Sequence, residues 1–153
     1  MHARRNHARQ GMTLVEFALL MPVLLFLLLG VMESGNMFFS WLTVQKAAQE
    51  SVRVAATGIG DEEGTRMTLI EDAAMERLDP LDGTKTVTVT SWPGMDASGP
   101  GIEGSAGGPC QVVEVKVAYL YSPLVPLMEP ILPESMTLTS ADRKVNEPWK
   151  PCE

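Results

Sequence analysis

The chain has 153 residues, of which 19 are acidic and 12 are basic, and its formal net charge is −7. Residues 1–11 carry three arginines and no acid, so the charge of +3 there contrasts with −10 over the remainder. An acidic chain of this kind lacks the basic face that nucleic-acid binding requires, and nucleic acid is therefore excluded as a partner. The length suits one small domain beside a membrane segment.

Residues 12–33 form a long apolar run that predicts a membrane-spanning helix. From Met12 to Met32 the run has 21 residues, close to the ~20 that cross a hydrocarbon core of ~30 Å. Its one charged residue before Glu33 is Glu16, and a carboxylate costs roughly 2.5–3.5 kcal/mol at the centre of a helix in lipid, so this residue requires a function. By the positive-inside rule, residues 1–11 are expected in the cytoplasm and the acidic part of the chain outside.

The basic leader, Gly11 and a carboxylate at the fifth apolar position resemble the class III signal of type IV pilins and pseudopilins. In that family a prepilin peptidase cleaves after the glycine, which implies a processing site between Gly11 and Met12. The words LVEFALLMPVLLFLLLGVME, with Pro22 and a Glu shortly after a Gly, are more narrowly similar to TadE-like minor pseudopilins of the tight-adherence (Tad) pilus. The resemblance implies that Glu16 pairs with the new Met12 amine of a neighbouring subunit during assembly.

The same resemblance implies where the protein works and with what. It implies a single-pass protein of the bacterial inner membrane with its N-terminus in the cytoplasm and its head in the periplasm or outside the cell. The implied partners are a prepilin peptidase, other Tad pilins including a second minor pseudopilin, the assembly platform of the inner membrane, and the lipid bilayer.

Other functions are compatible with the same segment. One is an uncleaved single-pass anchor or adaptor with a head that faces the envelope, although such an anchor gives no reason for Glu16. Another is a minor pseudopilin of a type II secretion system. A cleaved secretory signal peptide is disfavoured because its apolar region normally has only 7–15 residues.

The helix is expected to continue beyond the membrane as an amphipathic segment over residues 34–57. A helix over residues 12–57 would be about 69 Å long, so its second half must project from the bilayer. The segment contains no proline, and apolar residues recur every three or four positions, at Met37, Trp41, Val44, Ala48, Val52 and Ala55.

Residues 58–153 predict a small α+β head. A second short helix is expected over residues 65–78, with Met67, Ile70, Ala74 and Leu78 on its apolar face. A three-stranded antiparallel sheet is expected to pack on the long helix, which is the minimal pilin-like arrangement. Alternating β-branched residues predict its strands over residues 86–90, 111–121 and 136–140.

The remaining segments of the head are expected to be irregular. Residues 92–109 are rich in Gly, Pro and Ser and predict a loop, and the residues after Ser140 predict a polar tail. Residues 122–133 contain four prolines, so they are expected to form an apolar loop that covers the head or rests on the membrane surface.

The residue types do not indicate an enzyme, a cofactor or a metal site. Both histidines, His2 and His7, precede the implied cleavage site, which leaves none for a catalytic triad or a zinc ligand set. The acids of residues 61–63 lack the alternating spacing of calcium ligands, so a solvated turn is expected there.

Cys110 and Cys152 are the two cysteines of the chain, and the expected topology places both in an oxidising compartment. A disulfide between them would close a loop of about 40 residues and stabilise the head by roughly 3–4 kcal/mol. Free thiols or a link to a partner are the alternatives.

Overall fold

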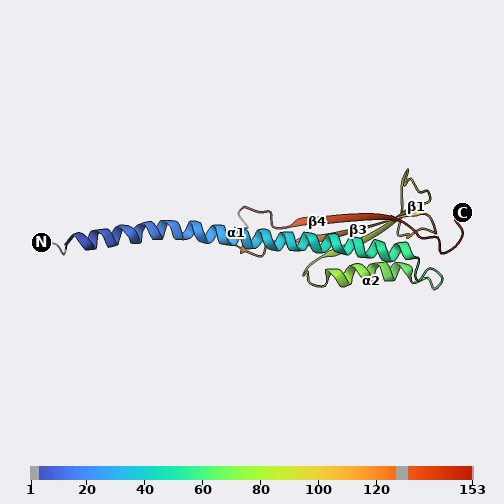
Figure 1. The fold of residues 1–153 in the computed structure, drawn as a ribbon, viewed down its shortest axis with the longest axis horizontal. Coiled ribbons are helices and arrows are strands. Elements are labelled where there is room, and N and C mark those ends of the chain that lie inside the picture. Colours follow the sequence, from blue (N-terminus) through green and yellow to red (C-terminus); the bar gives the residue numbers. More distant parts are fainter. Residues whose placement is uncertain (1–3, 127–130, 153) are drawn as a thin grey trace.

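The computed structural model describes residues 4–126 and 131–152, and a single long helix organises it. Helix α1, Arg4–Thr57, has 54 residues and is therefore about 80 Å long. Figure 1 shows that the rest of the chain packs beside the second half of α1, while the first half extends alone. The molecule is thus a bare helical stalk that continues into a small head.

The head contains one further helix and one sheet. Helix α2, Arg66–Leu78, lies against α1. The sheet is antiparallel throughout, with the strand order β2-β1-β3-β4. Its strands are β1 (Lys85–Trp92), β2 (Ile102–Glu103), β3 (Val112–Tyr121) and β4 (Met136–Val145).

The expected α+β layout of long helix, short helix and antiparallel sheet is confirmed, but the expected number of strands is wrong. The sheet has four strands because β2 forms inside the segment expected to be a loop, where Ile102 pairs with Ser91 and Glu103 with Thr90. A strand of two residues is too short to show the alternation by which strands are predicted.

The end of the sheet also differs from the expectation of a polar tail after Ser140. Strand β4 continues to Val145, and its last residues remain paired with β3, for example Arg143 with Glu114. The ladder hydrogen bonds come from the backbone, so a strand at the sheet edge forms there even though its side chains are mostly polar.

The core lies where α1 is enclosed between the sheet and α2 (Figure 1). The predicted apolar faces meet there, except that Trp41 is 41% exposed and its ring lies 5.9 Å from that of Phe38. The buried side chains come from α1 (Val44, Ala47, Ala48, Val52, Ala55), α2 (Ile70, Ala74, Leu78) and β3 (Val113, Val115, Val117, Tyr119, Tyr121).

The C-terminal end of α1 is closed by the chain's last residues. Gly58 follows the helix with a positive φ of 71°. This conformation is common at the ends of helices and is unfavourable for residues other than glycine. The backbone N–H of Glu147 donates to the carbonyl of Ala56 at 2.8 Å, which satisfies one of the unpaired carbonyls of the last turn. The ring of Trp149 covers Gly58 so closely that a Cβ there would lie 2.2 Å from a ring carbon.

We predict that Gly58→Ala lowers the thermal unfolding midpoint of the full chain in detergent micelles more than Gly64→Ala does. Gly64 also has a φ of 71°, but no atom lies within 4 Å of the position that a Cβ would take there, so both variants carry the same backbone cost of about 1–2 kcal/mol. Only Gly58→Ala must also displace Trp149. Circular dichroism recorded during heating would measure the two midpoints. An equal decrease in both variants would show that the Trp149 contact does not hold the tail.

Candidate assembly site

The predicted processing and pairing residues lie on the bare part of α1. Gly11 is within the helical backbone, Met12 is 66% exposed, and Glu16 is exposed one turn further along. Residues four apart lie on the same helix face, so Met12 and Glu16 are neighbours on one surface. Among the side chains of residues 12–126 and 131–152, none forms an ion pair or hydrogen bond with Glu16.

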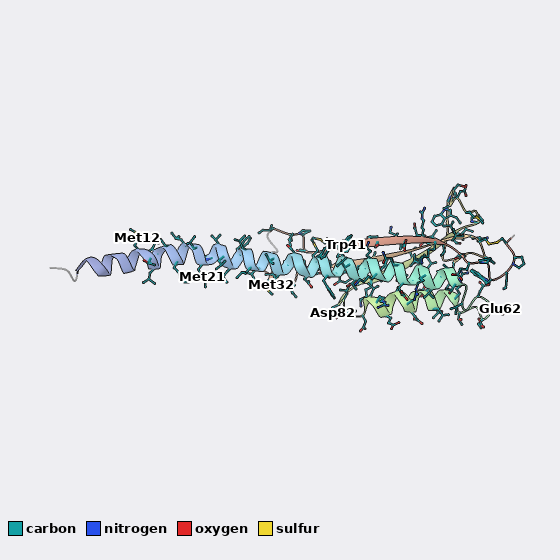
Figure 2. All side chains as sticks on the ribbon, viewed as in Figure 1. Met12, Met21, Met32, Trp41, Glu62 and Asp82 are labelled. Carbon is teal, nitrogen blue, oxygen red and sulfur yellow. A yellow bond between two sulfur atoms is a disulfide. The ribbon has the colours of Figure 1, made fainter. Side chains whose placement is uncertain are left out.

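The surface around Glu16 is apolar and fully available to other molecules. The helix from Met12 onward is long and apolar enough to cross a membrane, and its apolar window is not buried at all within the protein. Figure 2 shows Met12 and Met21 along the stalk, clear of the head, and Met32 where the head begins. In water such a surface would be strongly unfavourable, so it indicates contact with lipid or with other helices.

A buried carboxylate marks the point at which the head begins. Glu33 is only 4% exposed. The hydroxyl of Tyr121, at the end of β3, donates to its Oε1, and the backbone N–H groups of Leu124 and Val125 donate to its Oε2 at 3.0 and 2.9 Å. Asn36 in turn donates to the Tyr121 hydroxyl at 3.1 Å. These donors satisfy a charge that would otherwise be costly to bury, and they tie the β3–β4 connection to α1.

Sequence reasoning does not find this cluster. In the sequence, Glu33 is only the residue at which charge resumes after the apolar run, and Tyr121 is only part of the predicted buried face of a strand. The signal that could have identified the cluster is a lone acid at the end of the run, followed within one turn by Asn36.

A second polar cluster, around Arg66, holds the far end of the head. The Arg66 side chain is 5% exposed, and burial lowers its pKa, an effect that nearby Asp61 partly opposes. Its guanidinium donates to the backbone carbonyls of Ala55 at 2.6 Å, Gly107 at 2.5 Å and Ala106 at 3.2 Å. It therefore joins the end of α1, the start of α2 and the loop before β3 through one buried charge.

The C-terminal segment completes this second cluster. The ring of Trp149 lies 4.5 Å from the guanidinium carbon of Arg66, a cation–π contact. The amide of Asn146 donates to the carbonyls of Ala106 and Gly108 at 2.9 and 2.8 Å.

The structure joins Cys110 and Cys152 in a disulfide with their Cα atoms 5.7 Å apart, which attaches the chain's end to the segment just before β3. The disulfide and the cluster around Arg66 both connect the loop before β3 to other parts of the head. Both lie at the opposite end of the molecule from Glu16. Among residues 4–126 and 131–152, no group of three or more His, Cys, Asp or Glu side chains is placed to hold a metal ion.

The comparison with protein families gives a match to the stalk and the first part of the head. Residues 11–53 match the family model described as TadE-like protein. The resemblance expected from the sequence is thereby confirmed over these residues, which begin at Gly11 and include both Glu16 and Glu33. They are 43 of the 153 residues, and the sheet and α2 lie outside the matched range. No curated protein and no solved structure matches the chain.

The TadE-like match suggests a protein associated with the Tad pilus and with its other components. The apolar helix, in the same segment, suggests a membrane anchor.

We predict that the phenol of Tyr121 titrates near pH 12 in the variant Tyr119→Phe, in which it is the only tyrosine left. Burial, and then the hydrogen bond to Glu33, raises the pKa of Tyr121 from 10 to about 12. The folded protein disfavours the phenolate, so the neutral Tyr121 side chain contributes to the stability of the fold. This contribution is fully present below pH 10 and is lost as the pH rises toward about 12. Tyrosinate absorbance and circular dichroism, recorded together, would measure both effects. A midpoint near pH 10 with the fold intact would contradict the Glu33–Tyr121 contact.

Proposed function

We propose that this protein is a TadE-like minor pseudopilin, processed by a prepilin peptidase and needed for assembly of a tight-adherence pilus. The observation that carries the proposal is the bare first half of α1, whose exposed apolar surface from Met12 to Met32 contains a single carboxylate, Glu16, within the TadE-like match. An apolar helix that only had to anchor a head would have no use for that carboxylate. A helix that must dock beside other helices in a membrane can use the carboxylate to pair with a positive charge on a neighbour.

The proposed chemistry begins with cleavage of the peptide bond between Gly11 and Met12. Cleavage removes the three arginines of residues 1–11 and leaves a positively charged amine at Met12. An amine and a carboxylate are each costly in a hydrocarbon environment, and pairing them lowers that cost. Since Met12 and Glu16 are one turn apart, a neighbouring helix shifted by about 6 Å along its axis would bring its own Met12 amine to Glu16.

The proposed organisation assigns a role to each part of the chain. Residues 1–11 are the cytoplasmic leader, residues 12–33 span the inner membrane, and residues 34–57 carry the helix into the head of residues 58–153. The head faces the periplasm or the cell exterior, where the disulfide between Cys110 and Cys152 is stable. The proposed partners are the prepilin peptidase, other Tad pilins with a second minor pseudopilin, and the assembly platform of the inner membrane. The role is structural, with no catalytic step of its own.

We expect the mature protein to begin at Met12 in cells that contain the prepilin peptidase, and to keep residues 1–11 in cells that lack it. Mass spectrometry of the N-terminal peptide from membrane fractions would measure this. A chain that retains the leader in both strains would instead support an uncleaved anchor. Cleavage after residue 33 would support a secretory signal peptide.

We expect Glu16→Ala to abolish or strongly reduce surface pili while leaving membrane insertion and cleavage after Gly11 intact, because the variant loses only the partner of the Met12 amine. Phe17→Ala is the matched control, since Phe17 is the next residue, is 60% exposed, and carries no charge. Electron microscopy would count the pili, and fractionation would follow the protein. Normal piliation in Glu16→Ala would refute the pairing role without affecting the processing result.

A further inference from the structure

The connection between β3 and β4 returns to the apolar part of α1. Its first residues are fixed at Glu33 through the N–H groups of Leu124 and Val125. On its other side, Ile131 lines a shallow hollow with residues of α1 around and before Glu33: Phe26, Leu27, Gly30, Val31 and Ser34. Phe26 is about 7 residues before Glu33, or about 10 Å along the helix axis. This part of the head therefore overlaps the segment expected to lie in the membrane.

Leu124 and Ile131 give the connection an exposed apolar surface, and the backbone donors of residues 123–126 are satisfied. Leu124 and Ile131 are each 62% exposed, as much as the apolar side chains of the stalk beside them. Pro123 and Pro126 have no N–H, and the N–H groups of Leu124 and Val125 both bind Glu33. Residues 123–126 thus have all their donors satisfied, which irregular backbone needs before it can enter a low-dielectric environment.

Residues 122–133 of the connection carry one charge, and exposed aromatic residues follow Glu33 along α1. Within residues 122–133 the only charged residue is Glu129, which lies outside the described residues. Phe38 and Phe39, about one and a half turns beyond Glu33, are 57% and 51% exposed. Aromatic side chains are enriched where a membrane protein crosses from hydrocarbon to water. The apolar surface of the stalk therefore passes into that of the connection and ends at an aromatic boundary.

We propose that residues 123–126 and Ile131 insert into the outer side of the bilayer that α1 spans, so that the head rests on lipid through a second contact beside its helix. Lipid is the occupant because this surface is continuous with the apolar surface of the stalk. Glu33 holds the inserted segment at a defined depth and on one side of α1. A head fixed in this way cannot rotate freely about its own stalk. The proposal rests on the membrane-anchor part of the proposed function, and on neither cleavage nor Tad assembly.

Photo-crosslinking of the full chain tests this directly. The photoreactive residue p-benzoylphenylalanine is placed at one position at a time, and the protein is reconstituted into vesicles of phosphatidylcholine and phosphatidylglycerol. Ile131 is the test position. Ile59, in the turn just after α1, is the matched control because it is the same residue type with the same exposure of 62%. Leu24, 53% exposed on the stalk, is the positive control.

We expect lipid adducts at position 131 in a yield comparable with position 24 and at least several-fold above position 59, as measured by mass spectrometry. If position 131 behaves like position 59 while position 24 labels lipid, the segment lies in water and the inference is wrong. Crosslinks from position 131 to a second copy of the chain in place of lipid would also overturn it, because the surface would then be a subunit contact. If position 24 fails to label lipid, the membrane anchor itself fails, and with it the proposed function.

Discussion

One helix has to satisfy two different surroundings, and this constraint shapes the whole molecule. The first half of α1 exposes large apolar side chains on every side, while the second half buries small ones, such as Ala47 and Ala48, beneath a sheet and a second helix. Small residues there let the other elements approach closely on two sides. The large residues of the stalk suit contact with lipid chains and with neighbouring helices. The change between the two kinds of surface begins near Glu33, and large apolar side chains stay exposed as far as Trp41.

Glu33 lies at that change, and its burial explains how the change is made. A carboxylate at the end of an apolar run would normally face the aqueous side of the membrane. Here the chain returns from β3 to cover it, and Tyr121 and two backbone N–H groups replace the water. Removing one of these donors would leave a buried charge incompletely satisfied, which costs about 1–3 kcal/mol or more. The head is therefore attached to α1 at its membrane end by polar contacts and along its length by apolar packing.

The opposite end of the head depends on a second buried charge. Arg66 donates hydrogen bonds to carbonyl groups of two segments that are distant in the sequence. The ring of Trp149 covers both Arg66 and the end of α1. With the disulfide, this cluster joins the end of α1, the start of α2, the loop before β3 and the C-terminal segment. The contacts that stabilise this end are thus separated from Glu16, the proposed assembly residue, by most of the length of α1, so that changes in one need not disturb the other.

The sequence by itself determined the long helix, its apolar half with Glu16 in it, and the inward faces of α2 and β3, because each depends on local periodicity or on the length of an apolar run. It did not reveal β2, the continuation of β4 to Val145, or the roles of Glu33, Arg66 and Asn146. Strand β2 is too short to show a period, and β4 beyond Ser140 forms because β3 offers it a partner, whatever its side chains are. The buried polar groups take their partners from segments far away in the chain, and only the tertiary structure brings those segments together.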